Sequence, residues 1–248
     1  MAVKSLEPEL TVALYGKAGT GKTTLASTFP GPTLFLDCAE RGTDSIRDTD
    51  ADVIRAETYE DLEDAYWFLK KSKHRYKTVV VDTMSQAQDL AIRQLKEVEP
   101  GALGNWGTMR QQDWGTVSTQ LKTFILTMRN LPMNVIFIAH DRTFGGGDED
   151  EEDGTAIAPT VGPRLMPSVS TVLEGAVSII GNTYIRERIV SKRVKGQKKP
   201  KKVKRIEYCL RIGPNATYST KIRKPKKIVL PDQLIDPSYE KIIGLITS

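Results

Sequence analysis

Short apolar runs recur along the first 140 residues, and each is followed by a polar loop and a stretch with helical spacing. The apolar runs are Leu10–Tyr15, Thr33–Leu36, Thr78–Val81 and Asn134–Ala139. Helical spacing is found over 23–29, 57–71, 84–98 and 115–130. The run Thr78–Val81 is uncharged and β-branched, as expected for a strand buried on both faces. Strands that alternate with helices predict an α/β fold, in which a mostly parallel twisted sheet is flanked by helices.

The pattern becomes mostly strand-like after residue 175. We expect strands over Ala176–Ile180, Thr183–Val190 and Arg205–Ile212, with a basic hairpin over 191–205. These strands form an antiparallel extension over 176–230. No linker interrupts the chain, so we predict one domain over 1–248, with a short tail at 1–9 and a C-terminal segment at 231–248.

Charge is distributed unevenly along the 248 residues. The net charge is +5, but residues 1–180 hold 18 basic and 26 acidic side chains, whereas residues 181–248 hold 18 basic and 5 acidic ones. The last 68 residues therefore have a net charge of +13. A basic region of this kind is typical of a protein with a polyanionic partner.

Composition excludes several protein classes. The sequence has no run of about 18 apolar residues that could span a membrane and no apolar signal segment near its start. Its two cysteines and two histidines supply neither a disulfide framework nor a zinc cluster. We expect a cytoplasmic protein with no membrane partner.

A complete phosphate-loop motif, G-x-x-x-x-G-K-[ST], follows the first apolar run. It predicts a nucleotide-binding loop in which glycines aim backbone N–H groups at phosphate oxygens. Lys22 is expected to contact the β- and γ-phosphates, and the Thr23 hydroxyl to bind Mg²⁺. The next helix presents its positive N-terminal end to the same anion. The predicted nucleotide-binding residues are Gly16, Lys17, Ala18, Gly19, Thr20, Gly21, Lys22, Thr23 and Thr24.

Polar residues follow the other apolar runs, where ligands of open α/β sheets bind. Asp82 ends a Val-Val-Val run and is expected to hold the Mg²⁺ shell, directly or through water. Glu40 is the candidate base that activates water, with Asp37 as the next choice; alternatively, Glu40 is a surface residue that pairs with Arg41. His140 is a candidate γ-phosphate sensor, although a histidine at a turn is also common.

Together these stretches resemble the ATPase core of the RecA superfamily, and more narrowly the short RecA-like ATPases encoded by bacteriophages. Some of those proteins are single-strand annealing recombinases. The resemblance implies binding of ATP and Mg²⁺ at the interfaces of a homo-oligomer, either a ring or a filament. It also implies that Lys221 and Arg223 act on a neighbour's nucleotide, unless they belong to the general basic surface. A phage-encoded protein would act in the host cytoplasm.

The same resemblance places two DNA-binding loops at about 98–113 and 143–164, and implies a single-stranded DNA partner. A single-strand-binding protein is a further candidate partner. Trp106 could stack on an unpaired base or could serve packing alone. The second loop contains six acids at 148–153, which we expect to form a solvated loop. The remaining candidate DNA contacts are Arg110, Arg142, Arg164, Lys192, Arg193, Lys195, Lys198, Lys199, Lys201 and Lys202.

The leading hypothesis is therefore a Mg²⁺-dependent ATPase that binds single-stranded DNA and promotes annealing or homologous recombination. Three other functions stay open at this point. They are a hexameric helicase or translocation motor, a small-molecule or nucleotide kinase, and an ATP-gated loader with negligible turnover.

Overall fold

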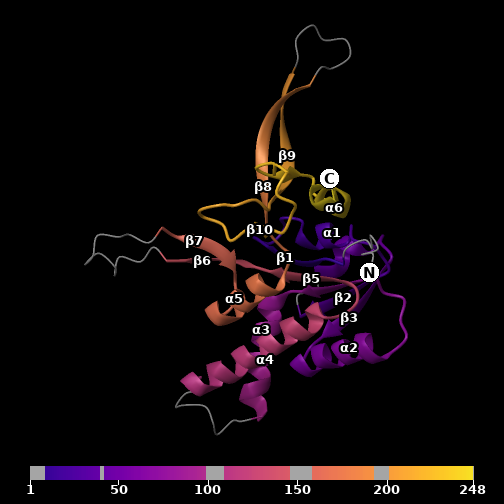
Figure 1. The fold of residues 1–248 in the computed structure, drawn as a ribbon, viewed down its shortest axis with the longest axis vertical. Coiled ribbons are helices and arrows are strands. Elements are labelled where there is room, and N and C mark those ends of the chain that lie inside the picture. Colours follow the sequence, from indigo (N-terminus) through magenta and orange to yellow (C-terminus); the bar gives the residue numbers. More distant parts are fainter. Residues whose placement is uncertain (1–8, 40–41, 99–108, 146–157, 193–200, 248) are drawn as a thin grey trace, which may run out of the picture.

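The computed structural model describes residues 9–39, 42–98, 109–145, 158–192 and 201–247 (Figure 1). Its helices are α1 (Lys22–Ala26), η1 (Gly42–Ile46, a 3₁₀ helix), α2 (Tyr59–Lys71), α3 (Met84–Val98), α4 (Gln111–Arg129), α5 (Pro167–Ala176) and α6 (Tyr239–Thr247). Its strands are β1 (Thr11–Tyr15), β2 (Thr33–Cys38), β3 (Ala51–Ala56), β4 (Thr78–Asp82), β5 (Asn134–Ala139), β6 (Asp141–Phe144), β7 (Thr160–Pro163), β8 (Ile179–Lys192), β9 (Lys201–Arg211), β10 (Lys221–Ile222) and β11 (Leu234–Ile235).

The central sheet has the order β11-β9-β8-β1-β5-β4-β2-β3, and β10 pairs with β8. The pairs from β8 through β1, β5, β4 and β2 to β3 are parallel, whereas β9, β10 and β11 join in antiparallel pairs. Strand β1 lies in the middle, between β5 and β8. This mostly parallel mixed sheet confirms the predicted α/β fold class.

Helices cover both faces of the sheet (Figure 1). One face packs against α1 and α6, with Leu14, Leu25 and Ile242 in the same buried cluster. The other face packs against α2 to α5 in a larger cluster that includes Leu62 and Leu121. The two faces alternate along each strand, so the central strands are buried on both sides. Among the described residues, no helix has the length and apolar character to cross a membrane.

The antiparallel extension differs from the prediction in how its first strands are divided. Ala176 is the last residue of α5, and the two strands expected at 176–180 and 183–190 form one strand, Ile179–Lys192. Residues up to Asn182 pair with β1, and residues from Asn182 to Lys192 pair with β9. Beyond the edge of the sheet, β8 and β9 continue as a two-stranded ribbon that projects from the molecule (Figure 1).

Several elements were not predicted. Strand β3 lies at the edge of the sheet and is largely exposed. Its sequence therefore includes the charged residues Asp52 and Arg55, which interrupt the apolar pattern that would reveal a strand. Helix α5 has a proline in its first turn, and its apolar residues recur at helical spacing. Helix α6 covers α1, and Tyr239 packs against Phe29 with ring centroids 5.0 Å apart. Helix α4 also begins earlier than predicted, at Gln111.

Candidate nucleotide-binding site

The phosphate loop lies between the carboxyl end of β1 and the start of α1, as its motif predicts. Lys22 is the first residue of α1 and is only 7% exposed. Its Nζ donates hydrogen bonds to the carbonyl oxygens of Gly16 (2.9 Å) and Lys17 (2.8 Å). The ammonium group is thus held over the loop, where backbone N–H groups and the α1 N-terminus favour an anion.

Thr183 of β8 supports the phosphate loop from the neighbouring strand. Its hydroxyl lies 2.7 Å from the Thr20 hydroxyl and donates to the Tyr15 carbonyl oxygen at 3.3 Å. Gly16 packs so closely against β8 that a Cβ atom there would lie 2.3 Å from the Thr183 carbonyl oxygen. The sequence carries no local signal for Thr183, because its role depends on β8 lying beside β1.

Two oxygen-bearing side chains meet where a metal ion is predicted. The Thr23 hydroxyl donates a 2.8 Å hydrogen bond to Oδ2 of Asp82, which ends β4. Asp37, the next-to-last residue of β2, is paired with Asp82, and both carboxylates are buried. Hydroxyl and carboxylate oxygens are ligands that Mg²⁺ prefers. The residues therefore fit a Mg²⁺ ion held by Thr23 and Asp82, which would polarise the phosphate oxygens.

The chain turns sharply directly after β2. Ala39 has a positive φ of 63°, and its N–H donates to the Asp37 carbonyl oxygen at 3.1 Å. Left-handed backbone at a non-glycine residue is strained and is often found at functional sites. Glu40, the predicted base, follows this turn and lies outside the described residues, so its role stays a prediction.

A cavity of about 700 Å³ contains most of these groups. His140, which follows β5, lines it together with Asp82, and its role as a γ-phosphate sensor stays a prediction. The His140 N–H donates to the Ser85 hydroxyl at 3.1 Å, and its carbonyl oxygen accepts from the Arg164 N–H at 2.8 Å. The cavity lining also contains residues that the sequence did not indicate: Gly42, Ser45, Tyr208, Asp236 and Pro237.

Comparison with known proteins identifies the family of this chain. A family model described as an AAA domain matches residues 9–224. The chain belongs to the AAA domain family. Among solved structures, the flagellar accessory protein FlaH from Methanocaldococcus jannaschii matches with a TM-score of 0.38 and 12% identity, over 92% of this chain and 85% of that one. A search of curated proteins found no match.

Family membership and the complete phosphate loop make this AAA domain a P-loop ATPase domain with an ATP-binding site. The Mg²⁺ requirement, the DNA partner and the narrower resemblance to phage annealing recombinases stay predictions.

The two predicted trans-acting cations of this AAA domain lie away from its own nucleotide cavity. Lys221 is paired with Ile180 near the start of β8, and its Nζ donates to the Glu174 carbonyl oxygen at the end of α5. Arg223 donates to the Gly175 carbonyl oxygen at 3.2 Å. Burial lowers the pKa of the Lys221 ammonium, and the nearby Arg223 adds to this effect. Within one chain, these residues bind the C-terminal end of α5.

The arginines predicted to contact DNA lie in different surroundings. Arg110 precedes α4 and forms a two-pronged ion pair with the buried Asp113, through Nε (3.1 Å) and a terminal nitrogen (3.0 Å). Arg142 is exposed on β6, with its guanidinium 5.4 Å from the Phe144 ring centre. Arg164 lies 3.7 Å from Asp89, and both side chains are about half exposed. Arg110 therefore has a structural role at the start of α4, and its DNA role stays a prediction.

The basic hairpin forms the outer part of the β8–β9 ribbon. Lys192 pairs with Lys201, the last pair before the tip, and Lys202 is exposed beside Ser191. Near the base, Arg211 stacks on Tyr184, with 3.5 Å between guanidinium carbon and ring centre, and donates to Asn182 at 2.8 Å. The acidic run 148–153 lies outside the described residues. Five of the predicted DNA contacts also lie outside them: Trp106, Arg193, Lys195, Lys198 and Lys199.

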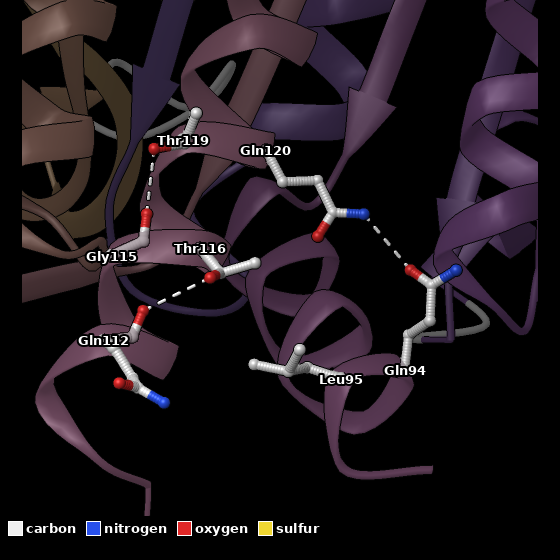
Figure 2. Close-up of a pocket in the computed structure, with 7 residues that line it drawn as sticks. All are labelled: Gln94, Leu95, Gln112, Gly115, Thr116, Thr119 and Gln120. Atoms are coloured by element: carbon white, nitrogen blue, oxygen red, sulfur yellow. Dashed lines mark hydrogen bonds between the residues drawn. The ribbon is translucent and has the colours of Figure 1, made fainter. Parts of the chain in front are cut away.

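A second cavity, of about 750 Å³, lies between α3 and α4 (Figure 2). The Gln120 amide donates to the Gln94 side chain at 3.2 Å, and the Thr116 and Thr119 hydroxyls donate to carbonyl oxygens of their own helix (Figure 2). The described residues that line this cavity are uncharged, and none of them is a predicted site residue.

Proposed function

We propose that this AAA-domain protein is a Mg²⁺-dependent ATPase that binds single-stranded DNA and promotes annealing or homologous recombination, with ATP bound between subunits. One observation carries the proposal: strand β9 contributes Tyr208 to the nucleotide cavity and, further along, basic side chains to the ribbon. The nucleotide site and the cationic surface therefore share one strand, and ATP binding can influence DNA binding directly.

The chemistry is assigned to groups at the carboxyl ends of the strands. Lys22 and the loop amides bind the phosphates, and Thr23 and Asp82 hold Mg²⁺. Glu40 activates the attacking water, with Asp37 as the alternative base. His140 lies beside Asp82 in the cavity and responds to the γ-phosphate.

If ATP binds between subunits, Lys221 and Arg223 can contact the nucleotide of a neighbouring subunit. A cation supplied by a neighbour neutralises charge that develops on the γ-phosphate, as an arginine finger does. Neither residue lines its own chain's cavity, so each is available to act on a neighbouring subunit. Closing of the interface around ATP would then favour assembly on DNA.

The ribbon provides the main DNA contact. Arg188 and Lys202 are exposed, and Arg188 lies opposite Arg205, so this part of the ribbon offers positive charge to a polyanion. Arg142, Arg164 and Trp106 are secondary candidates. Contacts with phosphates release counterions, so affinity should fall steeply as salt concentration rises.

The test measures ATP hydrolysis and binding of a fluorescent oligothymidine by the full chain at about 50 and 200 mM salt. We expect DNA to stimulate hydrolysis, and the Arg188→Ser/Lys202→Ser variant to lower the slope of log affinity against log salt by about 1.4. The matched control is Lys70→Ser/Lys73→Ser, an equal charge change at exposed positions on and just after α2. Lys22→Ala should abolish hydrolysis.

Absence of DNA binding at low salt would overturn the recombinase function and leave the ATPase function intact. Equal slopes for the two double variants would place the DNA contact elsewhere on the surface. Unchanged turnover in Glu40→Gln would move the catalytic base to Asp37.

A further inference from the structure

Tyr208 is an exposed aromatic residue at the base of the ribbon, where its strand neighbours are buried. Its side chain is 44% exposed, whereas Glu207 and Cys209 are at most 3% exposed. The strand alternation thus turns Tyr208 to the face opposite that of Glu207 and Cys209. That face is the one on which the ring lines the nucleotide cavity. A large apolar side chain exposed at this point has a surface available for a ligand.

The Tyr208 ring lies directly beside the phosphate loop. A Cβ atom built on Gly21 would be 3.3 Å from Cδ1 of the ring and 3.8 Å from Cε1. Gly21 immediately precedes Lys22, so the ring is adjacent to the residues that bind phosphate. When the phosphate loop holds the phosphates of a nucleotide, the Tyr208 ring is therefore within reach of its ribose and base.

The strand order decides which end of the nucleotide faces Tyr208. Asp82 ends β4 and His140 follows β5, on one side of β1 in the sheet, and Tyr208 belongs to β9, on the other side. Since the metal and the γ-phosphate belong beside Asp82, the ribose and base extend in the opposite direction. They extend toward β9.

A short segment completes the cavity at this end. The Asp236 N–H donates to the Tyr208 carbonyl oxygen at 2.7 Å, and Asp236 is held in left-handed backbone with φ of 47°. Its carboxylate is 3.3 Å from a guanidinium nitrogen of Arg205. These contacts fix the following residue, Pro237, on the cavity wall with Tyr208. An aromatic ring and a proline suit a flat heteroaromatic base.

We propose that Tyr208 is the base-stacking residue of the nucleotide site, and that the site selects purine over pyrimidine nucleotides. This inference rests on the nucleotide binding in the proposed function. The larger purine ring overlaps more of the tyrosine ring and gains more from stacking.

The experiment measures affinity of the full chain for ATP, CTP and inorganic tripolyphosphate, each with Mg²⁺, by calorimetry. Tripolyphosphate carries the phosphate contacts but no base. We expect Tyr208→Leu to weaken ATP binding by roughly 10- to 100-fold and leave tripolyphosphate binding unchanged. Tyr208→Phe should retain ATP affinity. Ile206→Ala is the matched control, because Ile206 is 59% exposed on the same face of β9 but does not line the cavity.

Equal weakening of ATP and tripolyphosphate binding by Tyr208→Leu would overturn the proposal, because the ring would then only support the phosphate loop. Unchanged ATP affinity would also overturn it. The wild-type chain gives a test that does not depend on variant folding, since equal affinity for ATP and CTP contradicts purine selection. Failure to bind either ATP or tripolyphosphate would overturn the nucleotide site itself, and is distinguishable from the other outcomes.

Discussion

The phosphate-loop region, at the carboxyl ends of the parallel strands, and the β8–β9 ribbon differ in how far their functional side chains are buried. The first region is called the sheet edge below. At the sheet edge, Lys22, Asp82 and Thr183 are all buried and hydrogen-bonded to other parts of the chain. Along the outer ribbon, the described side chains are mostly exposed, and the pair Lys204–Glu187 (3.0 Å) lies in solvent. Phosphoryl chemistry requires fixed distances, whereas attraction to a polyanion requires only charge. The burial of the phosphate-loop side chains and the exposure of the ribbon side chains follow from these two requirements.

Gly16→Ala tests how rigid the sheet edge is and should have the largest effect. The new methyl group would overlap the Thr183 carbonyl oxygen, and two adjacent strands cannot separate without loss of their hydrogen bonds. We expect the free energy of unfolding to fall by about 3 kcal/mol in urea denaturation. Gly19→Ala is the control: Gly19 has a φ of 77° but no atom within 4 Å of a new Cβ, so only backbone strain of about 1 kcal/mol applies. Similar losses in both variants would mean that β8 is free to move.

Two ion pairs that join β8 to β9 in the described part of the ribbon divide it into a fixed base and a solvent-exposed outer part. Arg186 binds Glu207 at 2.7 Å, and the Glu207 side chain is only 4% exposed. Arg186→Ala leaves that carboxylate buried without its cation, so we expect the melting temperature to fall by roughly 3–6 °C. Lys204→Ala removes a pair that is exposed on both sides and should change the melting temperature by less than about 1 °C. If the two variants melt alike, the boundary between base and outer ribbon is misplaced.

Ala39→Gly should have a small effect of the opposite sign. Glycine relieves the left-handed strain at φ 63° but increases the conformational entropy of the unfolded chain. We expect a net gain of about 0.5 kcal/mol in the free energy of unfolding, measured by urea denaturation. A loss of stability would contradict the assignment of strain to this turn.

The sequence predicted the sheet edge better than the ribbon for a physical reason. Phosphate binding dictates residue types at fixed spacing, so Lys22, Thr23 and Asp82 could be named before any contact was known. Thr183 and Tyr208 could not, because their contacts depend on β8 lying beside β1 and β9 lying beside β8, and neither strand carries a motif. Likewise, the apolar run of β4 was visible, but the exposed edge strand β3 was not. For the ribbon, the strand-like pattern predicted strands over 183–190 and 205–212 and a basic hairpin between them, but not the contacts at its base.

Strand β8 connects the ribbon to the centre of the sheet without a break. One continuous strand is held in the sheet as far as Asn182 and then runs free of β1 for ten residues to Lys192. At about 3.3 Å per residue, this arm is about 30 Å long. Thr183, the first residue of this arm, contacts the phosphate loop through its hydroxyl. The arm and the nucleotide site are therefore joined by one continuous backbone.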